Sequence, residues 1–168
     1  MALPTRKNLR LKDFDYTSAG AYFVTICAHH KQTVFGQIKS GVVELNPYGQ
    51  LAERVWRDLP EHFPDIRLDE FIVVPNHVHG VVFIDSERAR HASPLRQRAS
   101  NLGKVIGAFK SATTRLINRA RTTPGAALWQ RNYYEHVIRN EASLSEIREY
   151  IANNPLKWEL DEYFQDAS

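Results

Sequence analysis

The chain has 168 residues, of which 43% are hydrophobic and 24% charged, and a formal net charge of +3. That length is typical of one domain that buries about two-thirds of its unfolded surface, so we expect a single domain over residues 1–168. Apolar runs fall well short of the ~20 residues that a membrane helix needs, and the N-terminus lacks the apolar stretch of a secretory signal. Cys27 is the only cysteine, which excludes an intrachain disulfide, and together these features predict a cytoplasmic protein.

Residues 21–28 are rich in β-branched and aromatic side chains, which predicts a strand, and shorter strands are expected at 34–38 and 42–45. Asn46 and Pro47 are residue types typical of a helix N-cap and first turn. Leu51, Val55 and Leu59 follow at helical spacing. The first predicted helix therefore begins at about residue 47.

Residues 71–74 and 78–84 are apolar runs of strand length, separated by a Pro-Asn pair that predicts a tight hairpin. Apolar residues recur at helical spacing over 102–117, which predicts an amphipathic helix with a basic outer face. Residues 133–138 have the composition of a strand. Ser143 and Glu146 match a capping box, so the last helix is expected from there to about Asn153, with Pro155 ending it.

This order of elements predicts an α+β fold of the ferredoxin-like, split βαβ kind. It would contain an antiparallel sheet with helices on one face, an added β-hairpin and a C-terminal helix.

Charge is distributed unevenly along this fold. Between Arg88 and Tyr134 the chain has basic residues but no aspartate or glutamate, whereas residues 159–168 are acidic. Residues 86–100 are predicted to form a flexible basic loop and residues 1–12 a basic arm. A solvated helix face and a disordered loop would carry the same charges, so both interpretations remain open for each residue. The candidate DNA contacts are Arg88, Arg90, Arg96, Arg98, Lys104, Lys110, Arg115, Arg119 and Arg131.

A His-x-His pair lies at the start of the strand predicted over 78–84. Because side chains alternate along a strand, His77 and His79 project from the same face and could form half of a metal site. Such pairs also arise by chance, and a histidine among apolar neighbours is often only hydrogen-bonded in the core.

The last predicted helix could complete such a site. Tyr150 and Asn154 are four residues apart and share a helix face with Ile147 and Ile151. A helix laid over the histidines would bring a hydroxyl and an amide oxygen to the ion. The alternative is that Tyr150 extends an apolar stripe and Asn154 only ends the helix before Pro155.

The segment Val73-Val-Pro-Asn-His-Val-His-Gly-Val-Val-Phe83 resembles the HUH motif of single-tyrosine transposases of the IS200-like family. Further blocks resemble its REP-associated branch, whose members are linked to repetitive extragenic palindromes, and the resemblance extends from about Leu11 to Trp158. These blocks are Phe14-Asp-Tyr16, Gly20-Ala-Tyr-Phe-Val-Thr25, Gly103-Lys-Val-Ile-Gly-Ala-Phe-Lys-Ser111, Trp129-Gln-Arg-Asn-Tyr-Tyr-Glu-His136 and Tyr150-Ile-Ala-Asn-Asn-Pro155.

The resemblance implies a metal-dependent endonuclease and strand transferase that acts on single-stranded DNA at a hairpin and forms a 5′-phosphotyrosine. It implies Tyr150 as the nucleophile, and His77, His79 and Asn154 as ligands of Mg²⁺ or Mn²⁺. Insertion-sequence members often have glutamine where this chain has the shorter Asn154. The protein would be a monomer or a homodimer, since some relatives exchange the tyrosine helix between subunits.

Two rival functions remain open at this point. One is a ferredoxin-like nucleic-acid-binding module without catalysis, and the other is a metallohydrolase that acts through a bound water. Tyr133 and Tyr134 could stack on bases or pack in the sheet, and His136 could donate to a phosphate or to an ordinary hydrogen bond.

Overall fold

The computed structural model describes residues 19–85 and 100–160, with side chains as far as residue 158. The elements in chain order are β1 (Gly20–Cys27), η1 (His29–Lys31), β2 (Gly36–Lys39), β3 (Val42–Leu45), α1 (Pro47–Arg57), α2 (Leu59–His62), β4 (Ile66–Val74), β5 (His77–Ile84), α4 (Leu102–Ala120), β6 (Tyr134–Ile138), α5 (Glu141–Asn153) and η2 (Asn154–Leu160). The predicted basic arm over 1–12 and Arg88, Arg90, Arg96 and Arg98 lie outside the described residues.

The main sheet has four strands in the order β4-β5-β1-β6, and every neighbouring pair is antiparallel. The first and last strands of the motif are therefore neighbours, with the β4–β5 hairpin beside them, as in a split βαβ arrangement. Strands β2 and β3 form a separate antiparallel hairpin. The predicted ferredoxin-like α+β fold with an added hairpin is confirmed.

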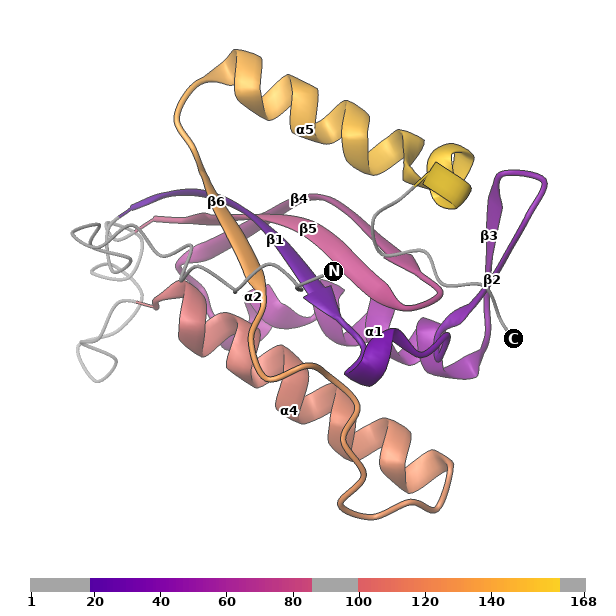
Figure 1. The fold of residues 1–168 in the computed structure, drawn as a ribbon. Helices are drawn as coiled ribbons and strands as arrows, with labels where there is room; N and C mark the ends of the chain where they lie inside the picture. Colours follow the sequence, from indigo (N-terminus) through magenta and orange to yellow (C-terminus); the bar gives the residue numbers. More distant parts are fainter. Residues whose placement is uncertain (1–18, 86–99, 161–168) are drawn as a thin grey trace, which may run out of the picture.

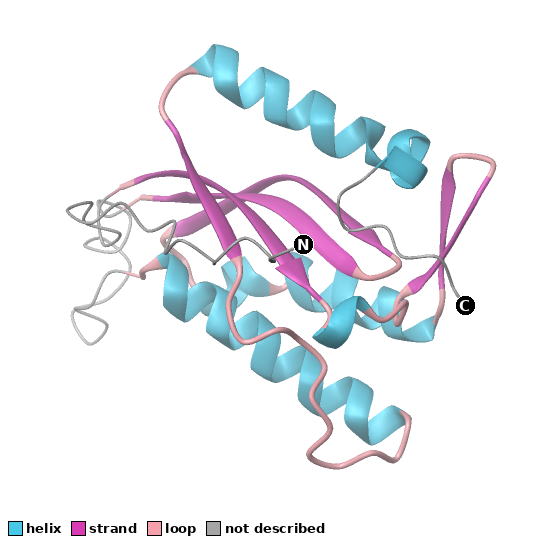
Figure 2. Cartoon of the chain, in the orientation of Figure 1, coloured by secondary structure: helices cyan, strands magenta, loops and turns pink. Residues whose placement is uncertain are grey.

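Helices lie on both faces of this sheet, as Figures 1 and 2 show. Helices α1 and α4 pack on one face, where Trp56 and Phe109 join Tyr22, Val24 and Val82 in the larger core. Helix α5 lies across the other face over a smaller core of apolar side chains: Phe23, Val81, Ile138, Leu144 and Ile151. Among the described helices, none is both long and apolar enough to cross a bilayer.

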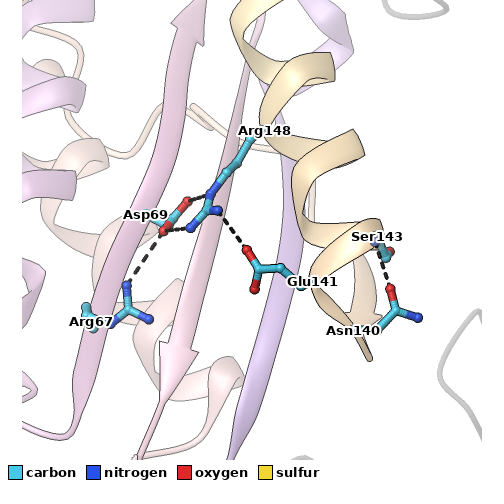
Figure 3. Close-up of polar contacts among 6 residues, drawn as sticks. All are labelled: Arg67, Asp69, Asn140, Glu141, Ser143 and Arg148. Carbon is cyan, nitrogen blue, oxygen red and sulfur yellow. Dashed lines mark hydrogen bonds and ion pairs between the residues drawn. The ribbon is translucent and has the colours of Figure 1, made fainter.

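Helix α5 begins earlier than the sequence predicted, and a different residue caps it. The side chain of Asn140 accepts a hydrogen bond from the Ser143 amide at 2.8 Å, and the helix starts at Glu141 (Figure 3). The predicted capping box of Ser143 and Glu146 is therefore wrong. Both asparagine and serine are good N-caps, and Asn140 satisfies this helix end first.

The other end of α5 also differs from the prediction. The α-helix ends at Asn153 as predicted, but Asn154 keeps a right-handed helical backbone, with φ −56° and ψ −43°. The chain then continues through Pro155 into the 3₁₀ helix η2. The bias of a pre-proline residue against helical geometry is thus overridden here, and η2 turns back over the sheet.

Three further boundaries were not predicted. Strand β4 begins at Ile66 rather than Phe71, and a register shift between Leu68 and Phe71 disguises its alternation in the sequence. Helix α1 ends at Arg57, before the short α2. Ser100, the last residue of the predicted flexible loop, is 7% exposed and its amide donates to Asp65 Oδ2 at 2.6 Å, while residues 86–99 of that loop lie outside the described residues.

Candidate active site

The two histidines of the His-x-His pair lie side by side on β5, on the face that α5 covers. The Pro75-Asn76 turn connects β4 to β5, and His77 is the first residue of β5. Because side chains alternate along a strand, His77 and His79 point to the same face. Their Nε2 atoms are 2.9 Å apart, and the residues are 0% and 1% exposed. The predicted pairing of the two imidazoles is confirmed.

A neighbouring asparagine fixes which nitrogen of His77 carries the proton. Asn76 Nδ2 donates to the Lys31 carbonyl at 3.3 Å, so its Oδ1 faces His77 and can only accept. The Nδ1–H of His77 therefore donates to Asn76 Oδ1 at 2.7 Å. Burial, and then the charge of Lys31, lower the pKa of His77 to about 3, so the ring is neutral near pH 7. Its Nε2 consequently presents a lone pair.

His79 is held by residues of the neighbouring strand. Thr25 pairs with His79 across β1 and β5, and the hydroxyl Oγ1 is 2.8 Å from His79 Nδ1. Phe23 stacks on the His79 ring with centroids 5.4 Å apart. On the other side of the pair, Trp158 of η2 stacks on His77 at 5.9 Å. Both imidazoles thus have a fixed orientation, with their Nε2 atoms meeting.

Helix α5 brings the predicted tyrosine and asparagine to this point. Tyr150 Oη is 3.4 Å from His79 Nε2, and Asn154 Nδ2 is 3.5 Å from the same nitrogen. Asn154 is buried at 2% exposure, whereas Tyr150 is 42% exposed. Leu144 and Ile151 fill the core, whereas the Tyr150 ring meets Phe23 at the edge of that core and its hydroxyl lies beside His79.

An ion pair holds α5 over the sheet from the β4 side. Arg148 Nε donates to Asp69 Oδ1 at 2.7 Å and its NH2 group to Oδ2 at 2.8 Å (Figure 3). Arg67 and Glu141 flank this pair at 3.6 and 3.3 Å. The hydrogen-bonded Arg148 lowers the pKa of Asp69 to about 2. Such a two-bond contact fixes helix position as well as charge.

The donor set fits a divalent cation with open positions. Two nitrogens at right angles, each about 2.1 Å from one ion, are about 3 Å apart, which matches the 2.9 Å between the two Nε2 atoms. A half-turn of the Asn154 amide would place its oxygen where Nδ2 now lies. The described residues contain no group of three or more His, Cys, Asp and Glu side chains that could hold a metal. The third protein ligand would therefore be an amide, and mixed imidazole and oxygen donors favour Mn²⁺ over Mg²⁺.

Known proteins resemble this chain in sequence and in fold. Residues 48–154 match the family described as "Transposase IS200 like". An uncharacterized Haemophilus influenzae protein is 38% identical, with 96% of this chain and 94% of that protein covered. The chain belongs to the IS200-like transposase family.

Two further matches concern REP-associated proteins. The Haemophilus influenzae protein named "Putative REP-associated tyrosine transposase" is 25% identical, with 90% of this transposase and 79% of the relative covered. The solved structure of a REP-associated tyrosine transposase bound to a REP hairpin has a TM-score of 0.59 at 17% identity, covering 83% of this chain and 68% of that one. The second match shows a shared fold.

The predicted DNA contacts that the structure describes lie on α4 and on the segment that follows it. Lys104, Arg115 and Arg119 are exposed on α4, which packs against the face opposite α5 (Figure 1). With Arg131, the two arginines line a hollow of about 1000 Å³ between α4 and the segment 122–131. Lys110 also lines this hollow, and its Nζ donates to the Gln130 and Arg131 carbonyls at 2.7 and 3.2 Å.

Residues 133–136 separate into two faces of β6. Tyr133 packs against the larger core on the α4 side. Tyr134 lies on the α5 side, where Phe23 meets its ring edge-on at 6.2 Å, and it is 38% exposed. By alternation, His136 is on the same face as Tyr134, and it is also exposed. The structure thus places the two neighbouring tyrosines on opposite faces of the sheet, a distinction that the sequence did not provide.

The sequence reasoning missed several residues that shape this transposase site. Thr25 and Asn76 orient the histidines, Trp158 covers His77, and the pair of Asp69 and Arg148 holds the tyrosine helix. Asn76 and Thr25 do lie inside sequence blocks shared with the family, which was the available signal. No local pattern marks the contact between Asp69 and Arg148, since 79 residues separate them.

Proposed function

We propose that this protein is a metal-dependent endonuclease and strand transferase for single-stranded DNA, with Tyr150 as the nucleophile. The observation that carries the proposal is the position of a half-exposed phenol 3.4 Å from one of two converging imidazoles. Membership of the IS200-like transposase family supports this reaction class. The hairpin-bound structure of a relative supports a hairpin-containing single strand as the partner.

His77, His79 and Asn154 would hold Mn²⁺ or Mg²⁺. When bound there, the cation would withdraw charge from a nonbridging oxygen of the scissile phosphate. The neutral state of His77 suits this role, because a protonated imidazole cannot be a ligand. The exposure of Tyr150 leaves room for a DNA strand beside the buried histidines.

In the proposed reaction the Tyr150 oxygen attacks phosphorus and the bond from phosphorus to the deoxyribose 3′ oxygen breaks. The phenol loses its proton and the departing 3′ oxygen ends as a hydroxyl. The product is a 5′-phosphotyrosine, and a free 3′ hydroxyl of another strand can reverse the step. A phenol is a better leaving group than an alkyl alcohol, which favours strand transfer over simple hydrolysis.

One chain contains all the proposed reacting groups. Tyr150 and Asn154 lie on the α5 side of the same chain's β5 histidines, and Arg148 ties α5 to the same chain's β4. We therefore propose that a monomer is competent for cleavage and that exchange of the tyrosine helix is unnecessary.

The test is incubation of the purified protein with Mn²⁺ or Mg²⁺ and a labelled single-stranded hairpin. A covalent protein–DNA adduct that is lost in Tyr150→Phe is expected. His77→Ala should abolish cleavage and retain DNA binding, whereas His62→Ala, an exposed histidine on α2, should retain both. Cleavage without an adduct would indicate a hydrolase, and binding without cleavage would indicate a module without catalysis. Either of these two results would refute the proposal.

A further inference from the structure

Among the described residues, α5 is anchored to this face of the sheet at the β4 edge. The ion pair of Arg148 with Asp69 ties α5 to β4, which is one edge of the sheet, and β6 is the other edge. On β6, Ile138 is buried under α5, but Tyr134 and His136 of the same face are exposed. We call Tyr134 and His136 the β6 strip.

The β6 strip is in register with the candidate active site. Thr25 of β1 pairs with His79 on one side and with Tyr134 on the other. The three residues therefore form one row across the sheet, and two strand spacings place Tyr134 about 10 Å from His79. The β6 strip continues the surface on which Tyr150 lies.

Phe23 supports all three aromatic groups of this surface. It stacks on His79, meets Tyr150 edge-on at 6.0 Å and meets Tyr134 edge-on at 6.2 Å. Phe23 itself is 8% exposed, so it cannot present a ring face to a ligand. Tyr134 keeps 38% of its surface exposed although it rests against this core. It is thus a positioned aromatic ring that contacts the same Phe23 as Tyr150 does.

Basic residues flank β6 in the chain. Arg139 follows β6 directly and Arg131 lies three residues before it, where it also lines the hollow beside α4, and both are exposed. Glu135, the only acidic residue of β6, alternates onto the opposite face. Exposed aromatic rings with basic flanks bind single strands, because unpaired bases stack on the rings while phosphates meet the cations. Duplex DNA cannot use Tyr134 in this way, since its base faces are already stacked.

We infer that Tyr134 stacks on an unpaired base next to the scissile phosphate, and that the β6 strip binds the single strand as it leaves Tyr150. This inference rests on the proposed function for the identity of the strand, but it concerns binding rather than chemistry. Tyr134 is then a binding residue that aligns the strand.

The experiment measures binding in the Tyr150→Phe protein, which leaves the DNA uncut. The probes are single-stranded oligothymidine and a strand of the same length that keeps its sugars and phosphates but lacks bases. Adding Tyr134→Ala should weaken oligothymidine binding roughly five- to 150-fold, the effect of losing one stacked base, and leave binding of the abasic strand unchanged. Tyr134→Trp should retain tight binding.

Control variants separate stacking from other causes. Tyr134→Leu keeps an apolar side chain and is the variant to use if Tyr134→Ala does not fold. It should also bind oligothymidine more weakly, because leucine has no ring face on which a base can stack. Arg115→Ala should weaken both probes alike if α4 contacts phosphates. Unchanged oligothymidine binding by a folded Tyr134→Ala or Tyr134→Leu variant, or equal loss for both probes, would overturn the inference. So would a change of oligomeric state in sedimentation without a change in DNA affinity, which would assign the strip to a second copy of the chain.

Failure of this inference and failure of the proposed function give different results. If binding depends on bases and on Tyr134 but no covalent adduct forms, the role of the β6 strip is supported and the transferase activity is refuted. A covalent adduct that requires Tyr150, together with DNA binding that does not change in Tyr134→Ala, would support the transferase and refute the role of Tyr134.

Discussion

Thr25→Val should weaken Mn²⁺ binding because the Thr25 hydroxyl is a hydrogen-bond partner of His79 Nδ1 in either tautomer of that ring. His77 carries its proton on Nδ1, so a hydrogen bond across the 2.9 Å between the two Nε2 atoms needs the proton of His79 on Nε2. Thr25 then donates to His79 Nδ1. A bound cation needs lone pairs on both Nε2 atoms, so the His79 proton must move to Nδ1. The Thr25 hydroxyl then accepts a hydrogen bond from this Nδ1–H. A hydroxyl serves both states, and a methyl group serves neither.

The size of the effect follows from burial. Thr25 is 2% exposed and His79 1%, so water does not replace a lost hydroxyl, and a buried polar group without a partner costs about 1–3 kcal/mol. Valine leaves His79 Nδ1 bare with and without the cation, so only part of that cost falls on binding. We expect roughly tenfold weaker Mn²⁺ binding, the lower end of the usual range for residues that orient metal ligands.

Isothermal titration of Mn²⁺ into the wild-type protein, Thr25→Val and Thr25→Ser measures this effect. Serine keeps the hydroxyl and should restore most of the affinity. A folded valine variant that binds Mn²⁺ as tightly as the wild type would refute the tautomer reasoning, as would a serine variant that is as weak as valine.

Three further predictions concern stability and are measured by urea unfolding. Gly80→Ala places a Cβ 2.3 Å from Trp56 Cζ2 and should cost about 1–3 kcal/mol, whereas Gly107→Ala on α4 meets nothing within 4 Å and should stabilise by about 0.5–1 kcal/mol; equal effects would contradict the packing described. Asn140→Ala should cost about 1 kcal/mol and Ser143→Ala much less, and the reverse order would restore the capping box. Because Arg148 lowers the pKa of Asp69 from 3.8 to about 2, the ion pair stabilises above about pH 4 and is lost as the pH falls through about 2. The stability difference between the wild type and Asp69→Asn should shrink over that window, and a constant difference would exclude the ion pair as its cause.

The sequence predicted the fold well where local signals agreed with tertiary packing. Examples are the alternation in β5, the spacing along α4 and the turn at Pro75-Asn76, where the local pattern and the observed element agree. Prediction failed where two local signals competed, as at Asn140 and Ser143, and where an irregular register hid the alternation of β4. The tyrosine and its neighbours on α5 were found because helical spacing links Tyr150 to Asn154.

Residues that act through a neighbouring strand could not be predicted in the same way. Thr25 orients His79 only because β1 and β5 pair with that register, and one residue of slip would turn its hydroxyl to the opposite face. Tyr133 and Tyr134 are equivalent in composition and adjacent in sequence, yet the pairing of β6 with β1 decides which of them faces the site. Such assignments need the register, which no single segment encodes.

The two flanks of α5 explain why the site is open on one side only. The Arg148 flank closes the sheet toward β4, while the Tyr150 flank faces Phe23 on β1 and, beyond it, the β6 strip. Trp158 of η2 covers His77, and among the described residues of this face Tyr134 and His136 on β6 are exposed. The exposed arginines of α4 lie on the reverse face. A strand that contacts both Tyr150 and Arg115 would reach both faces of the sheet. Because Tyr134 of β6 lies on the α5 face and contacts Phe23, β6 is the strand where we expect a substitution to separate DNA binding from chemistry.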